Sequence, residues 1–157
     1  MALGDQALGA FRDPEHACHE KECDDKDISG YGYELTFKLK KDSYEDEEGE
    51  IRNVCGILQS IARITFKDGE IFQPNEFIYT GQTTGIDAYK KSSLTGFITV
   101  KDPTVNTIMT PNGEVRFVEL IGMTDAELKT LSNSDSVVNI FQKLGSDVTD
   151  YHRSSLV

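Results

Sequence analysis

SGYGYELTFKLKK, residues 29–41, is the stretch of sequence that decides the fold. From Tyr31 onward, large apolar residues alternate with small or polar ones, which is the period of a β-strand with one buried face. The residues that we predict to face the core are Tyr31, Tyr33, Leu35, Phe37 and Leu39. The sequence therefore predicts a strand over residues 30–41.

Two glycines and one acid in this strand need a separate explanation. Gly30 and Gly32 indicate either a turn or bulge, or a place where another backbone approaches closely, because glycine has no side chain. Glu34 points away from the apolar row, so it is either solvated or paired with a basic residue such as Arg63. The sequence alone leaves both alternatives open in each case.

The bulk properties describe one acidic globular domain. The chain has 157 residues and a net charge of −11, and residues 1–50 alone carry a net charge of −9. Such a field repels nucleic acid and anionic lipid and attracts cationic surfaces. We therefore expect neither a nucleic-acid nor a membrane partner, although acidity also serves solubility alone.

Three features favour a cytoplasmic protein. The cysteines are odd in number (Cys18, Cys23 and Cys55), which argues against a disulfide framework. No apolar run approaches the ~20 residues that span a bilayer. The first residues lack the basic n-region of a secretory signal.

Residues 1–28 differ from the rest of the chain. They show no sustained period, and acids dominate between Asp13 and Asp27. We predict a loosely ordered acidic lead-in over 1–28 and a folded domain over 29–157. The cluster of His16, Cys18, His19 and Cys23 in the lead-in lacks the spacing of zinc fingers and ribbons, so we assign no metal to it and expect no cofactor.

Apolar residues at spacings of three and four predict a helix over about residues 50–66. Its predicted buried stripe is Ile51, Val54, Cys55, Leu58, Ile61 and Ala62. Cys55 lies within this stripe, so we interpret it as a small core residue and not as a nucleophile. Gly69 is suited to a left-handed C-cap that ends the helix.

The second half of the chain predicts further strands and two helices. TPNGE (110–114) is the strongest hairpin turn, and VRFVELIG (115–122), apolar on both faces, predicts a central or doubly covered strand. Thr124 and Glu127 predict a capping box, and a last helix begins at Ser134 or Asp135. The order of elements predicts an α+β fold with a mostly antiparallel or mixed sheet of about 4–6 strands packed against about 3 helices.

Common catalytic signatures are absent from the sequence. It has no phosphate-binding glycine loop, no GxSxG motif and no HExxH motif. The alternatives to a binding protein are a small hydrolase that uses the acidic loop and His152, or a regulatory domain that binds a small ligand. We favour a protein that is not an enzyme.

Five blocks of sequence, in order, resemble the suppressor-of-fused family. They are SGYGYELTFKL (29–39), GILQSIARITF (56–66), FQPNEFI (72–78), TPNGEVRFVELIGMTDAEL (110–128) and VTDYHRSSLV (148–157). The aromatic-rich strand that the family has upstream of the first block is missing, and no second lobe follows. The chain therefore resembles a bacterial single domain of this family.

The resemblance implies protein binding. In animals, the family holds zinc-finger transcription factors by adding an extended peptide as a strand, and related bacterial domains act as immunity proteins against polymorphic toxins. The partner would be a basic or extended segment of a toxin domain, or a second copy that pairs at an exposed sheet edge. The resemblance and the first strand together assign partner binding to Asp25, Asp27, Gly30, Tyr31, Gly32 and Glu34.

Overall fold

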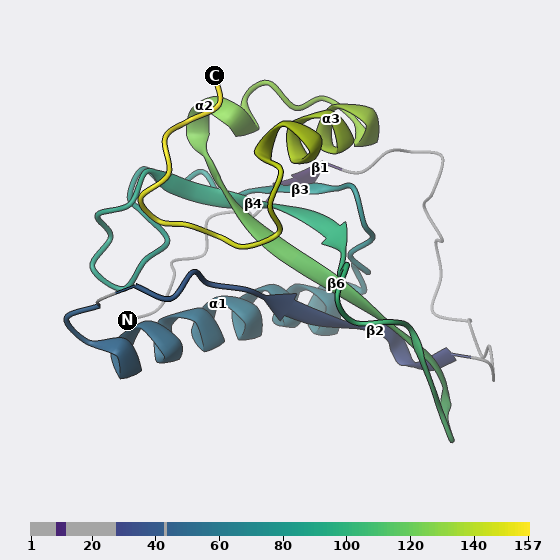
Figure 1. Ribbon diagram of the computed structural model, residues 1–157. Coiled ribbons are helices and arrows are strands. Elements are labelled where there is room, and N and C mark those ends of the chain that lie inside the picture. The colour runs from purple at the N-terminus through teal and green to yellow at the C-terminus, as the bar shows by residue number, and fades with distance from the viewer. Residues whose placement is uncertain (1–8, 12–27, 43) are drawn as a thin grey trace.

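The fold is an α+β sandwich built on one mixed sheet, as predicted. This computed structural model describes residues 9–11, 28–42 and 44–157 (Figure 1). The strands are β1 (Gly9–Phe11), β2 (Ile28–Phe37), β3 (Phe77–Tyr79), β4 (Leu94–Lys101), β5 (Ile108–Thr110) and β6 (Gly113–Thr124). The helices are α1 (Glu47–Asp68), α2 (Asp125–Leu128) and α3 (Ser134–Leu144).

The long strand β6 is the centre of the sheet. The strand order is β1-β3-β4-β6-β2, and β5 pairs with the beginning of β6. β2 runs parallel to β6, whereas the other strand pairs are antiparallel. The prediction that residues 115–122 form a central strand is confirmed, since β6 lies between β4 and β2 and its apolar side chains are buried on both faces apart from the half-buried Phe117.

Helices cover both faces of the sheet. α1 lies along one face, and α2 and α3 lie on the other (Figure 1). One core cluster lies under α2 and α3 and includes Ile98, Ile121, Val137 and Ile140. The other cluster lies toward α1, and the side chains of β2 that pack against it are Tyr33, Leu35, Phe37 and, just beyond the strand, Leu39. The predicted core face of β2 is confirmed for these four residues.

α1 forms where the sequence predicts it, and its predicted stripe is partly correct: Ile61 is buried and Leu58 packs against the core, whereas Ala62 is exposed. Cys55 is exposed and Ile51 is 57% exposed, so the prediction that Cys55 is a core residue is wrong. The buried residues are Glu50, Ile61 and Thr65. Glu50 accepts hydrogen bonds from the Tyr151 hydroxyl (2.7 Å) and the Ala88 amide (3.0 Å), and Tyr33 bonds to Thr65. These bonds compensate the burial of the polar side chains of Glu50 and Thr65.

The predicted caps and the hairpin turn are confirmed. Gly69 adopts φ 74° at the end of α1, and its amide bonds to Thr65. Thr124 and Glu127 form the capping box of α2. Thr110 pairs with Gly113, so β5 and β6 are joined by a turn of two residues. These local signals fix the ends of the elements that position the sheet.

Part of the sequence-based interpretation lies outside the described residues. The predicted lead-in lies almost entirely there, including His16, Cys18, His19 and Cys23, so the boundary at residue 28 and the absence of a metal stay predictions. Within the described ranges, no helix has the length and apolar character that a membrane span requires.

Candidate functional site

Three strands extend beyond the rest of the sheet as an arm. β4 ends at Lys101, which is paired with Val118 of β6. Past this point, β6 continues with β5 on one side and the beginning of β2 on the other. We call residues 28–34, 108–110 and 113–117 the arm, and it projects away from the helices at the lower right of Figure 1.

The two glycines of β2 form a bulge in the arm. Ile28 is paired with Glu114 and Tyr33 with Arg116, so β2 has three more residues than β6 across this interval. Gly30 and Gly32 adopt φ 59° and 75°, a left-handed conformation that other residues avoid. The bulge interpretation is therefore confirmed.

The bulge also changes the direction of Tyr31. The prediction that Tyr31 faces the core with the other apolar residues of β2 is wrong, because its side chain is 47% exposed. The left-handed glycines on both sides of Tyr31 interrupt the alternation that holds from Tyr33 to Leu39. An aromatic side chain is thus presented to solvent at the beginning of the strand.

β2 has an open edge. Ile28 and residues 33–37 pair with β6 on one side of the strand, and among the described residues no strand pairs with its other side. Unpaired backbone amides and carbonyls along such an edge are a template for another extended chain. Glu34 is exposed on β2, as the solvated alternative has it, and Arg63 is exposed on α1.

Sequence analysis missed two apolar residues of the arm. Ile108 and Met109 of β5 are 46% and 74% exposed. Their signal in the sequence is a pair of large apolar residues directly before the predicted turn at TPNGE. With Tyr31 they give the arm exposed apolar surface, and the exposed carboxylates of Glu34 and Glu114 give it negative charge.

The other end of β2 is held by a network of charges. Lys38 Nζ donates to Asp102 Oδ1 (3.0 Å), Glu119 Oε2 (2.9 Å) and Asp147 Oδ2 (2.6 Å). Asp102 also accepts hydrogen bonds from Thr36 Oγ1 (2.8 Å) and from the amide of Thr104 (2.8 Å). We call Lys38, Asp102, Glu119 and Asp147 the lysine cluster.

Three members of the lysine cluster, Lys38, Asp102 and Glu119, have a shifted pKa with a definite cause. Burial alone would lower the pKa of Lys38, but hydrogen bonds to the three carboxylates outweigh it and raise this pKa. Burial alone would raise the pKa of Asp102, but hydrogen bonds from Thr104, Thr36 and Lys38 lower it. Burial raises the pKa of Glu119 to about 7, against the opposing effect of Lys38.

Backbone hydrogen bonds hold the same end of β2. Leu39 forms a parallel bridge with Thr149. The Lys40 amide donates to the Thr149 carbonyl (2.9 Å), and the Thr149 amide donates to the Lys38 carbonyl (2.8 Å). The chain after α3 is therefore attached to β2 just beyond its last residue.

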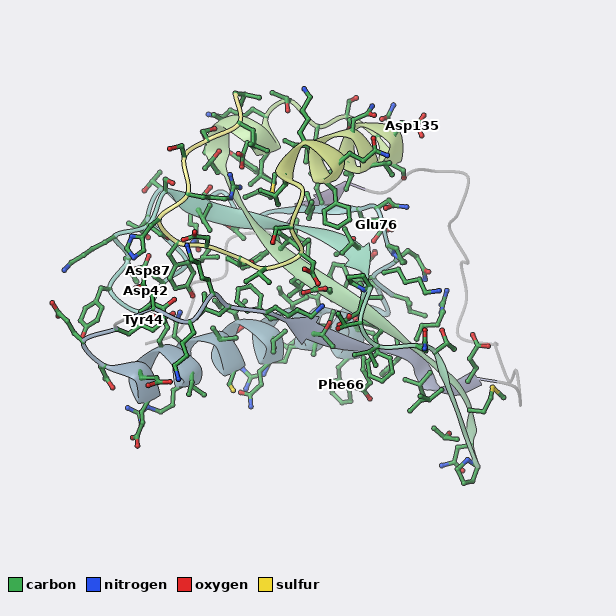
Figure 2. All side chains as sticks on the ribbon, viewed as in Figure 1. Asp42, Tyr44, Phe66, Glu76, Asp87 and Asp135 are labelled. Atoms are coloured by element: carbon green, nitrogen blue, oxygen red, sulfur yellow. The ribbon has the colours of Figure 1, made fainter. Side chains whose placement is uncertain are left out.

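His152 lies far from the arm. Its side chain is 72% exposed, and its Nε2 is 3.4 Å from Asp42 Oδ2. Asp42 lies with Tyr44 and Asp87 at the opposite end of the molecule (Figure 2). A general base of a hydrolase is oriented by a fixed partner in a site that limits water, and this exposed pair lacks those properties. The geometry therefore gives no support to the hydrolase alternative.

A protein-family model described as Suppressor of fused protein (SUFU) matches residues 14–154. The chain belongs to the SUFU family. The family predicted from the five sequence blocks is thereby confirmed, and the match begins upstream of the first block.

Known members of the family are longer than the matched region. The Suppressor of fused homologs of Homo sapiens and Mus musculus are each 27% identical to this chain over 100 residues, which is 64% of the chain. The match covers about a fifth of each of those proteins (20%).

Solved structures share the fold. The crystal structure of a Sufu–Fu complex has a TM-score of 0.68 with 27% identity, covering 90% of this chain and 63% of that one. The crystal structure of Drosophila Suppressor of Fused has a TM-score of 0.68 with 28% identity, covering 88% of this chain and 34% of that one.

The structure brings four of the six predicted partner-binding residues together. Gly30, Tyr31, Gly32 and Glu34 lie in or next to the bulge of β2, beside its open edge. Asp25 and Asp27 lie outside the described residues, so their role stays a prediction. Among the residues that are described, no group of three or more His, Cys, Asp or Glu side chains is arranged as a metal site.

Proposed function

We propose that this SUFU domain is a protein-binding domain without catalytic activity, and that the arm and the open edge of β2 hold its partner. The observation that carries the proposal is the glycine bulge, which leaves the β6 ladder and turns Tyr31 outward beside an unpaired strand edge. A structural neighbour is Sufu in complex with Fu, which supports protein binding as the general activity of the domain.

The surface of the arm defines the kind of partner. Exposed Tyr31, Ile108 and Met109 suit apolar side chains, and Glu34 and Glu114 suit basic ones. An extended segment with alternating apolar and basic residues would add a strand to β2 through main-chain hydrogen bonds and place both kinds of side chain on the arm. The net charge of −11 favours the approach of a basic partner.

Within this proposal, we favour a bacterial immunity-type role in which the partner is a toxin domain. The support is the resemblance to bacterial single domains and the acidic surface, which suits the neutralisation of a basic protein. A toxin gene directly upstream, and rescue of cell growth when both proteins are expressed together, are the expected observations. Toxicity that is unchanged by this chain would contradict the immunity role and leave the binding surface to be tested separately.

The binding surface is tested with variants of the arm. The partner is captured with the full chain from its native host, identified by mass spectrometry, and titrated against purified variants. Tyr31→Ser and Glu34→Lys are each expected to weaken the affinity about tenfold or more, as central interface residues do. Asp135→Lys, an equal charge change on exposed α3, is the control and should leave the affinity within about twofold. Equal losses in all three variants would refute the arm as the binding surface.

Charge reversal in the lead-in extends this test. Reversing Asp25 and Asp27 should weaken binding of a basic partner far more than it lowers the melting temperature, since these residues are predicted to contact the partner. Unchanged affinity would remove both residues from the binding surface while leaving the arm variants to decide the rest.

The open edge also allows pairing between two copies of the chain. Analytical ultracentrifugation over a range of concentrations distinguishes this case from binding of a different protein. A dimer that is lost in Tyr31→Ser would mean that a second copy competes for the edge. A monomer that still binds its partner would support the edge as a surface for other proteins.

A further inference from the structure

Glu119 is a buried acid with an unusual environment. It lies in the middle of β6, its exposed fraction is 0%, and it is opposite Thr36 of β2 and Val100 of β4. One carboxylate oxygen, Oε2, accepts a hydrogen bond from Lys38 (2.9 Å). In the described structure, the other oxygen, Oε1, is buried without a hydrogen-bond partner. Burying such an oxygen is unfavourable while it carries charge.

The charges that face Glu119 come from three other segments. Lys38 at the end of β2 supplies one positive charge, whereas Asp102 after β4 and Asp147 after α3 supply two negative charges. One lysine therefore faces three carboxylates, and the group carries two uncompensated negative charges if every member is ionised. A proton on Glu119 removes one of these charges and the desolvation cost of a buried anion.

The lysine cluster lies where two distant segments are joined. Lys38 is followed directly by the Leu39–Thr149 bridge, and its carbonyl accepts from the Thr149 amide. Asp147 is two residues before Thr149 and bonds to Lys38 at 2.6 Å. A change in the charge of Glu119 therefore acts directly on the contacts that hold residues 147–149 against β2.

We propose that Glu119 is a proton-dependent latch: its neutral form holds the end of β2 and residues 147–149 together, and its ionisation loosens them. This role concerns how the domain is held together and stands whether or not β2 binds a partner. The group that changes is a carboxyl of β6, and the contacts that respond are the hydrogen bonds between residues 38–40 and Thr149.

The direction of the pH effect follows from the pKa of Glu119. Burial raises this pKa from its ordinary value of 4.5 to about 7. A raised pKa in the folded state means that the stabilisation is complete below about pH 4.5 and is lost as the pH rises toward 7. Asp102 has a lowered pKa, so its contribution to stability is lost only at acidic pH. It therefore does not obscure the effect of Glu119 between pH 4.5 and 7.

The latch is tested by NMR on the full chain. A carboxyl ¹³C titration from pH 4.5 to 8.5 should give Glu119 a midpoint well above that of ordinary glutamates. Over the same range, the amide-exchange protection factors of Lys40 and Thr149 should fall about tenfold or more, because their hydrogen bonds lie at the latch. A Glu119 midpoint below about pH 5, or protection that does not change with pH, would overturn the proposal.

Variants separate the latch from general effects of pH. In Glu119→Gln, which is uncharged and of equal size, the protection of Lys40 and Thr149 should no longer depend on pH. Glu114→Gln is the matched control, since Glu114 lies exposed on the same strand and its removal should leave the pH dependence intact. If Glu119→Gln does not fold, Asp147→Asn removes a neighbouring charge from a partly exposed position and should lower the midpoint of Glu119. Unchanged behaviour in the folded variant would contradict the latch.

Discussion

The two ends of β2 differ in how they are held in the structure. At its beginning, the strand leaves the β6 ladder, adopts left-handed glycine conformations and exposes Tyr31. Beyond its last residue, the chain is held by Lys38 through three carboxylates and by backbone bonds to Thr149. A strand end that binds a partner benefits from a fixed opposite end. If the strand were mobile, ordering it on binding would cost free energy and weaken the affinity. Under the proposed function, β2 would combine partner binding at its beginning with anchoring beyond its last residue.

The largest expected effect comes from removing the anchor. Lys38→Met leaves Asp102 and Glu119 buried without their cation, and loss of one member of a buried ionic group costs about 3 kcal/mol of unfolding free energy. Urea denaturation at pH 7 measures this loss. Lys40→Met is the control: Lys40 makes one exposed ion pair with Asp150 and should matter much less. Equal losses would mean that the lysine cluster is no stronger than a surface pair.

A smaller loss is expected at the bulge. Gly30 adopts φ 59°, and a Cβ added there would meet open space, so Gly30→Ala costs only backbone strain, about 1–2 kcal/mol. Gly30→Asn should cost less, because asparagine tolerates the left-handed conformation. Thermal denaturation of both variants distinguishes strain from contact. Identical losses for alanine and asparagine would contradict strain as the cause.

A glycine outside β2 should respond in the opposite direction. Gly56 lies on the exposed side of α1, and a Cβ there meets nothing within 4 Å. Gly56→Ala is therefore expected to stabilise the domain by about 0.5–1 kcal/mol, because glycine weakens a helix interior. The midpoint of urea denaturation measures the gain. Comparison with Gly30→Ala shows whether the backbone conformation of each glycine alone decides if alanine raises or lowers the unfolding free energy.

The smallest effect on stability is expected at the exposed tyrosine. Tyr31→Ser removes a side chain that is 47% exposed and lies outside both core clusters, so the unfolding free energy should change by no more than about 0.5 kcal/mol. Tyr33→Ser is the matched comparison within the same strand, because Tyr33 packs against the core and bonds to Thr65. Losses of equal size would mean that Tyr31 contributes to the core as Tyr33 does.

Local sequence signals predicted much of the fold. The period of two assigns Tyr33 to Leu39 to the core correctly, and the caps at Gly69 and Thr124 place the helix ends. The same period fails at Tyr31 because two left-handed glycines interrupt it. In α1, the predicted stripe is correct at Leu58 and Ile61 but wrong at Cys55. Glu50 and Thr65 are buried because hydrogen bonds compensate their polar groups, and a hydrophobic period does not reveal such bonds.

The site was predictable only where it follows one strand. Gly30, Gly32, Tyr31 and Glu34 are neighbours in sequence, so the single motif SGYGYELTF identified all four of them. The lysine cluster combines residues from four segments, and Ile108 and Met109 join the arm only through pairing with β6. Because the parallel pairing of β2 with β6 is not encoded in either strand alone, these associations required the topology.

The parallel pairing of β2 and β6 also has a consequence for synthesis of the protein. Lys38 and Glu119 are 81 residues apart, so β2 leaves the ribosome long before the strand that completes its ladder. Contacts between residues so far apart in sequence slow folding. Until β6 has been synthesised, the apolar strand β2 stays unpaired and can associate with other chains. We therefore expect that a translational pause between residues 40 and 113, which delays the synthesis of β6, raises the yield of aggregated protein.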